Sequence, residues 1–177
     1  MKRFFYMLLL IGLTFIQCKD PDRNVSNNFI SRIHTSNDDV DWYTKLGKTT
    51  LEKHISDFKR INWETDYWDQ YNSDQFNFPD LEVMDSDSLY YLSISVCPST
   101  PDTFQFCIAY GIHQEYNIGN TIEVKRVCKV FGSSTTNYEK PIHLISLFFQ
   151  QDFKAIKIEL NKMHFLYNVN DLFLNLN

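Results

Sequence analysis

Two alternating segments decide the fold: Tyr90-Tyr-Leu-Ser-Ile-Ser-Val-Cys97 and Thr103-Phe-Gln-Phe-Cys-Ile-Ala-Tyr110. In each, an aromatic or aliphatic residue occupies every second position, which is the period of a strand whose two faces differ. Pro98 and Pro101 lie between the segments and cannot donate to a sheet ladder, so they predict a loop. The stretch therefore predicts a β-hairpin around which the rest of the chain packs.

The flanking sequence adds further elements to this hairpin. Short apolar or alternating runs predict strands at 81–84 and 121–131, and the ambiguous segment 153–160 also favours a strand. Helical spacing predicts helices at 49–61 and 140–151, and the apolar segment 161–177 is expected to dock on the sheet. The expected fold class is α+β, an antiparallel sheet of four to five strands with helices on one face.

The first predicted helix carries its own start signal. Thr49 and Glu52 match a capping box, in which each side chain accepts from the other's free backbone N–H. Leu51, Ile55 and Phe58 share one face, and His54 beside them is expected on the surface of the helix.

The charge of the chain limits its partners. The 177 residues carry a net charge of -5, and residues 1–17 hold two of the 17 basic side chains and no acid. The remainder therefore has 15 basic and 22 acidic side chains, a net charge of -7. Without a basic stripe the protein is a poor candidate for nucleic-acid binding. Its charge suits a basic protein partner, because complementary charges steer association.

The N-terminus has the composition of an export signal. Met1-Lys2-Arg3 is a short basic region, and the run from Phe4 to Ile16 is uncharged and mostly apolar. Thirteen residues are short of the roughly 20 that span a bilayer, whereas they fit the apolar region of a signal peptide. A secreted protein cut at another site and an uncleaved N-terminal anchor are the alternatives.

Cys18 follows this run at once, and Phe15-Ile16-Gln17-Cys18 resembles the lipobox of bacterial lipoproteins. Phe15 and Gln17 depart from the usual aliphatic and small residues at their positions. The resemblance implies cleavage before Cys18, lipidation of that residue and attachment to a membrane of the bacterial cell envelope, facing the periplasm or the cell surface. We therefore expect an export signal peptide over 1–17, a lipidated cysteine and polar tether over 18–48, and a single domain over 49–177.

Residues 62–80 interleave aromatic and acidic side chains. Trp and Tyr are common interface anchors, because they offer a large contact area at a low entropy cost. Trp63, Tyr67, Trp68 and Tyr71 are therefore candidate partner-binding residues. The alternative is a loop whose rings cover one end of the sheet.

Three cysteines follow Cys18. The expected hairpin register places Cys97 opposite a residue near Thr103, which puts Cys107 beyond the Cα separation of about 4.4–6.8 Å that a disulfide needs. A Cys107–Cys128 bridge and three buried, reduced cysteines remain as alternatives.

The sequence contains no signature of a known catalytic centre. The five histidines lack the four-residue spacing of metal ligands on a helix, and no phosphate loop, dinucleotide fingerprint or nucleophile elbow occurs. We expect no metal and no cofactor. The favoured function is non-catalytic binding of a protein partner, with immunity against a toxin as its sharper form. The alternatives are a small exported hydrolase using Cys107 or a histidine, and a glycan or small-ligand binder.

Overall fold

All seven strands form one antiparallel sheet in the order β2-β1-β3-β4-β5-β6-β7. The computed structural model describes residues 28–35, 43–73, 77–100, 103–117 and 124–174. The strands are β1 (Phe29–His34), β2 (Thr44–Lys48), β3 (Asp80–Asp85), β4 (Tyr90–Thr100), β5 (Thr103–Asn117), β6 (Val124–Thr135) and β7 (His164–Leu174). The helices are α2 (Leu51–Arg60), α3 (Trp63–Asn72), α4 (Glu139–Phe149) and α5 (Phe153–Leu160).

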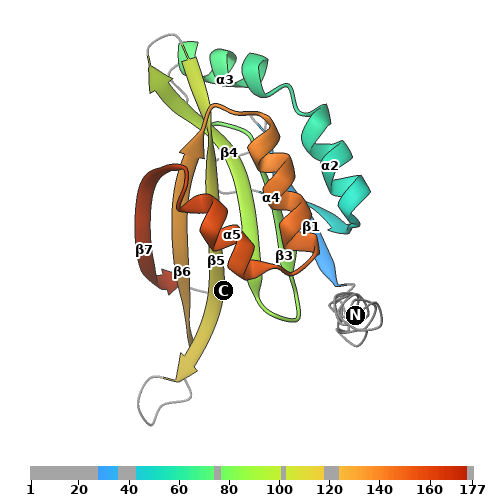
Figure 1. The fold of residues 1–177 in the computed structure, drawn as a ribbon, viewed down its shortest axis with the longest axis vertical. Helices are drawn as coiled ribbons and strands as arrows, with labels where there is room; N and C mark the ends of the chain where they lie inside the picture. Colours follow the sequence, from blue (N-terminus) through green and yellow to red (C-terminus); the bar gives the residue numbers. More distant parts are fainter. Residues whose placement is uncertain (1–27, 36–42, 74–76, 101–102, 118–123, 175–177) are drawn as a thin grey trace, which may run out of the picture.

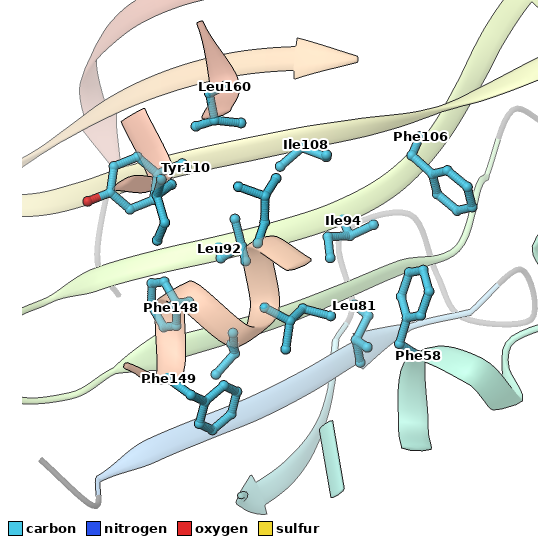
Figure 2. Packing of buried hydrophobic residues seen from close by; sticks show 14 of the residues in the cluster. Phe58, Leu81, Leu92, Ile94, Phe106, Ile108, Tyr110, Phe148, Phe149 and Leu160 are labelled. Carbon is cyan, nitrogen blue, oxygen red and sulfur yellow. The ribbon is translucent and has the colours of Figure 1, made fainter. Parts of the chain in front are cut away.

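The helices cover one face of the sheet, and the hydrophobic core lies between the two layers (Figure 1). Leu92 and Ile94 of β4 and Ile108 of β5 point to this face, where Phe148 of α4 packs with them (Figure 2). These four side chains are at most 1% exposed. Burying each stabilises the fold by roughly 1.5–3 kcal/mol. The predicted α+β class and antiparallel sheet are confirmed, but the sheet has seven strands rather than four to five.

The central hairpin is confirmed, although its register differs from the prediction. β4 continues through Pro98 to Thr100, which pairs with Thr103 after an irregularity between Pro98 and Thr100. Cys97 therefore lies opposite Gln105, and Cys107 lies diagonally across the ladder from it. Their Cα atoms are 6.1 Å apart and their sulfurs form a disulfide. The prediction that this pair is too far apart was wrong, because the turn is tighter than expected.

Two further predictions about elements were wrong. The segment 18–48, expected as a tether outside the domain, contains β1 and β2, so the folded part begins before residue 49. Segment 153–160 is helix α5 rather than a strand, since Asp152 caps it and Ile156 and Leu160 are buried four residues apart. The apolar C-terminal segment, expected to dock on the sheet, does so as strand β7, which pairs with β6. Cys18 lies outside the described residues.

Helix α2 begins one residue later than predicted. Its N-cap is Thr50, whose side chain accepts from the backbone N–H of Lys53, so the Thr49–Glu52 capping box was wrong. His54 is fully buried rather than on the surface. Its Nδ1 lies 3.0 Å from the hydroxyl of Ser31 on β1, which satisfies one ring nitrogen inside the core.

Candidate functional site

An open groove of about 600 Å³ lies where α3 meets the start of β5 and the segment that joins β6 to α4. Six of its lining residues are aromatic or apolar, and the other five carry a hydroxyl, an amide or, in one case, a carboxylate. We call this surface the aromatic groove; its lining residues are Ile61, Asn62, Trp63, Glu64, Thr65, Trp68, Thr103, Phe104, Phe106, Thr136 and Tyr138.

The floor of the aromatic groove is built on Trp63. Only 4% of this residue is exposed, its Nε1 donates to the backbone carbonyl of Phe58 at 2.9 Å, and its ring meets Phe106 edge-on with centroids 5.7 Å apart. The hydrogen bond fixes the indole at the junction of α2 and α3. Trp63 is therefore mainly a core residue, and the small part of its ring that lines the groove is held rigidly.

Trp68 forms a wall of the groove and keeps part of its surface exposed. Its ring packs edge-on against the fully buried Tyr67, with centroids 4.8 Å apart, and lies perpendicular to Tyr71 at 5.9 Å. Tyr67 and Tyr71 do not line the groove. Of the four predicted partner-binding residues, Trp63 and Trp68 therefore reach it, while Tyr67 is a core residue and Tyr71 supports Trp68 from behind.

Helical geometry explains this division. The alternation of aromatic and acidic residues predicts a single binding surface over residues 62–80. Residues 63–72 instead form helix α3, in which Trp63 and Tyr67 lie four residues apart and both turn inward. Sequence analysis missed Tyr138, which is 40% exposed at the mouth of the groove and packs against Phe58 and Phe106. No pattern in the sequence singles it out, because its neighbours in space come from α2 and β5.

Among its described lining residues, the aromatic groove carries one acidic side chain and no basic one. None of its lining residues is Lys, Arg or His, and Glu64 lies at its edge. Helix α3 also carries Asp66 and Asp69 and no basic residue. Partial burial, and then the neighbouring charge of Asp69, raise the pKa of Asp66, but this residue lines a separate hollow with Asp57 and Arg60. A cationic group in the aromatic groove would therefore meet the carboxylate of Glu64.

A second polar cluster lies on the sheet face that the helices leave uncovered. Arg32 of β1 makes a two-pronged ion pair with Glu82 of β3, at 2.7 and 2.8 Å, and its guanidinium stacks 4.4 Å above the ring of Tyr43. Ser93 of β4 donates to Asp80 at 2.7 Å. Burial raises the pKa of Asp80 to about 7, and the charge of Glu82 adds to this effect. A carboxyl with this pKa can exchange a proton near neutral pH, as catalytic residues do. Ion-pair networks that only hold strands together also shift pKa values, so the raised pKa of Asp80 does not by itself indicate a catalytic site.

Two arrangements bear on hydrolysis. Cys107 is joined to Cys97, so it has no thiolate to act as a nucleophile, and that part of the hydrolase prediction was wrong. Ser31 and His54 form a serine–histidine pair, but both are fully buried. Burial lowers the pKa of His54 to about 4. The neutral ring could accept a proton, yet no substrate reaches it.

Within the described ranges, no three His, Cys, Asp or Glu side chains converge as metal ligands. None of the described helices is long and apolar enough to span a bilayer. Searches against protein-family models, curated proteins and solved structures found no match for this chain.

Proposed function

We propose that the chain is a membrane-anchored lipoprotein of the bacterial cell envelope with a non-catalytic, protein-binding role, and that the aromatic groove is its binding surface. The observation that carries this proposal is the combination of partly exposed aromatic side chains with a lining whose described residues include Glu64 and no Lys, Arg or His. Trp and Tyr dominate binding energy at protein interfaces when they are held rigidly at the centre of a contact. Trp68 and Tyr138 are held in this way by Tyr67 and Phe58.

The partner is a protein with a basic side chain at the contact. An Arg or Lys that enters the groove would pair with Glu64 and stack on Trp68, since cations are attracted to indole faces. The net charge of -7 beyond residue 17 favours the approach of such a partner from a distance. Immunity against a toxin delivered by a competitor is the sharper form of this function.

Two observations support the envelope location. The Cys97–Cys107 disulfide is typical of oxidising compartments outside the cytoplasm. The resemblance of Phe15-Ile16-Gln17-Cys18 to a lipobox, directly after an apolar run, is the second observation. Dual or triple acylation of Cys18 would give a stable anchor, because a single chain binds only marginally.

The aromatic groove also suits a second candidate, a glycan ligand. The partly exposed Trp68 and the exposed Tyr138 offer aromatic faces on which a sugar ring can stack. Envelope sugars that shift the Trp fluorescence of the wild-type protein, but not of Trp68→Ala, would favour this candidate over a protein partner.

The protein-binding proposal is tested by affinity capture with matched variants. The wild-type protein is used as bait in extracts of its own cells and of competing strains, and bound proteins are identified by mass spectrometry. Trp68→Ala removes one wall of the groove, and Thr65→Arg introduces a positive charge at its edge without touching the core. Ile158→Ala is the control, because Ile158 is an exposed apolar residue on α5, outside the groove.

The proposal predicts one stoichiometric partner that is retained by the wild type and by Ile158→Ala and is lost from both groove variants. Identification of that partner as a toxin would support the immunity function. A partner retained equally by all four proteins would place the contact elsewhere and contradict the assignment of the groove. Absence of any partner would contradict the protein-binding function.

A further inference from the structure

A second concave site lies on the helix-covered side of the sheet, between α5 and strands β5, β6 and β7. Its volume is about 350 Å³, at the lower end of the range for small-molecule sites. It shares no lining residue with the aromatic groove. We call it the lysine pocket, because Lys129 of β6 and Lys157 of α5 line it from opposite sides of the gap between sheet and helix.

The base of the lysine pocket is a stack of aromatic rings. Tyr90 of β4 lies parallel to Tyr110 of β5, with centroids 5.5 Å apart and planes inclined by 7°. Phe153 of α5 stacks on Tyr90 at 4.3 Å and lies 6.4 Å from Tyr110. Phe131 of β6 adds a further ring to the lining. This base would accept the apolar body of a ligand, preferably a flat one.

The hydroxyl of Tyr110 is the unusual feature of this pocket. Tyr110 is 3% exposed, lines the pocket, and within the described residues its hydroxyl has no hydrogen-bond partner. Figure 2 shows this hydroxyl pointing away from Leu92 and Ile108, at the outer end of the core. A buried donor without an acceptor costs free energy. Burial, and then the neighbouring Tyr90, raise the pKa of Tyr110, so the group remains an O–H donor at neutral pH.

The cations of the pocket lack carboxylate partners within the described part of the chain. Lys140 of α4 and Lys162, just after α5, both form ion pairs with Glu159, at 3.0 and 2.6 Å. Lys129 and Lys157, in contrast, are exposed at the pocket and make no ion pair with a described residue. The side chains of Asn161 and Asn168 add amide donors at the same rim. Donors therefore surround a site whose interior is aromatic.

We propose that the lysine pocket binds a small amphipathic carboxylate: its acidic group lies between Lys129 and Lys157 and accepts from the Tyr110 hydroxyl, and its apolar body lies on the aromatic base. The carboxylate supplies the acceptor that Tyr110 lacks and the negative charge that the two lysines lack. This inference does not depend on the function proposed for the aromatic groove.

The test measures the binding of a defined probe to the purified full-length protein by calorimetry. The probe is 2-naphthoate, a flat aromatic carboxylate, and the matched neutral compound is 2-naphthamide. We expect 2-naphthoate to bind at concentrations below about 1 mM, and the amide to bind at least about tenfold more weakly, because a charge-assisted hydrogen bond is lost. Equal binding of the two compounds, or no binding of 2-naphthoate, would overturn the proposal.

Variants then locate the bound probe. Lys129→Gln and Lys157→Gln are each expected to weaken binding of 2-naphthoate at least about threefold. Lys154→Gln is the matched control: Lys154 is also an exposed lysine on α5, but it does not line the pocket. It should leave the affinity unchanged. An equal loss of affinity in Lys154→Gln and Lys157→Gln would show general charge attraction and overturn the assignment.

Tyr110→Phe separates ligand binding from a structural role. Because the hydroxyl has no partner in the free protein, its removal should leave the thermal unfolding temperature unchanged or raise it. The same variant should bind 2-naphthoate about tenfold more weakly. A lower unfolding temperature would show that the hydroxyl already has a partner, and an unchanged affinity would show that it does not contact the carboxylate. Either result would contradict the proposed role of Tyr110.

Discussion

Removal of the Cys97–Cys107 disulfide should destabilise the protein without changing its fold. The bridge joins residues ten apart in sequence on neighbouring strands. In the chain-entropy account, opening a loop of this length costs about 2.7 kcal/mol of unfolding free energy at 25 °C. For a chain of this size that loss lowers the midpoint of thermal unfolding by roughly 5–11 °C.

The assay is urea unfolding of the wild type and of the double variant Cys97→Ala/Cys107→Ala, each with and without a reductant. The account predicts that the reductant destabilises the wild type by about the same 2.7 kcal/mol and leaves the double variant unchanged. Wild-type protein that is insensitive to reductant, with Cys97 and Cys107 both titrating as free thiols, would refute the bridge. It would also remove one of the two supports for an extracytoplasmic location.

Three other perturbations have defined outcomes. The pKa of Asp80 is raised to about 7, so the folded state keeps a proton that the unfolded state loses above about pH 4. The free energy of unfolding should therefore fall by about 1.4 kcal/mol for each pH unit between pH 4 and 7 because of this residue. Asp80→Asn should abolish this fall when urea unfolding is measured at pH 5 and pH 8. Parallel pH profiles for the two proteins would count against the raised pKa. Trp63→Ala should cost about 3–5 kcal/mol in the same assay, because it opens a cavity in the core and removes the hydrogen bond to Phe58; a loss below about 1 kcal/mol would mean that the ring is not buried. Cys18→Ala should abolish incorporation of labelled palmitate and move the protein out of the membrane fraction, whereas lipidation that persists in this variant would exclude Cys18 as the acceptor.

The parts of the fold that were predictable from sequence are those in which one local pattern dominates. The hairpin follows from the alternation in 90–97 and 103–110, and α4 follows from its apolar face. Strand β1 was not recognisable because its core-facing position 31 is a serine. Its hydroxyl is tolerated inside because it hydrogen-bonds with His54, 23 residues later, and with the backbone carbonyl of Glu82. Because the pairing of Ser31 with His54 joins residues that are distant in the sequence, no local pattern predicts that His54 is buried.

The remaining differences come from ambiguous periods and from the register of a turn. Ile156, Ile158 and Leu160 alternate like a strand, yet positions 156 and 160 also share one helix face, and the Asp152 cap favours the helix. The disulfide was missed because the register depends on how tightly the chain turns between Thr100 and Thr103. At the candidate site, sequence singled out Trp63 and Trp68, but it could not show that Tyr138 and Phe106 join them from other elements.

Site-specific photo-crosslinking in living cells would test the central claim most directly. A benzophenone amino acid is placed at position 65, at the edge of the aromatic groove, or at position 158 on α5 as the control. The cells are irradiated alone and in contact with competing strains. The account predicts a single crosslinked protein from position 65, none from position 158, and loss of the product when Trp68→Ala is added. Position 65 giving no more product than position 158 under either condition would contradict the claim that the groove binds a protein partner.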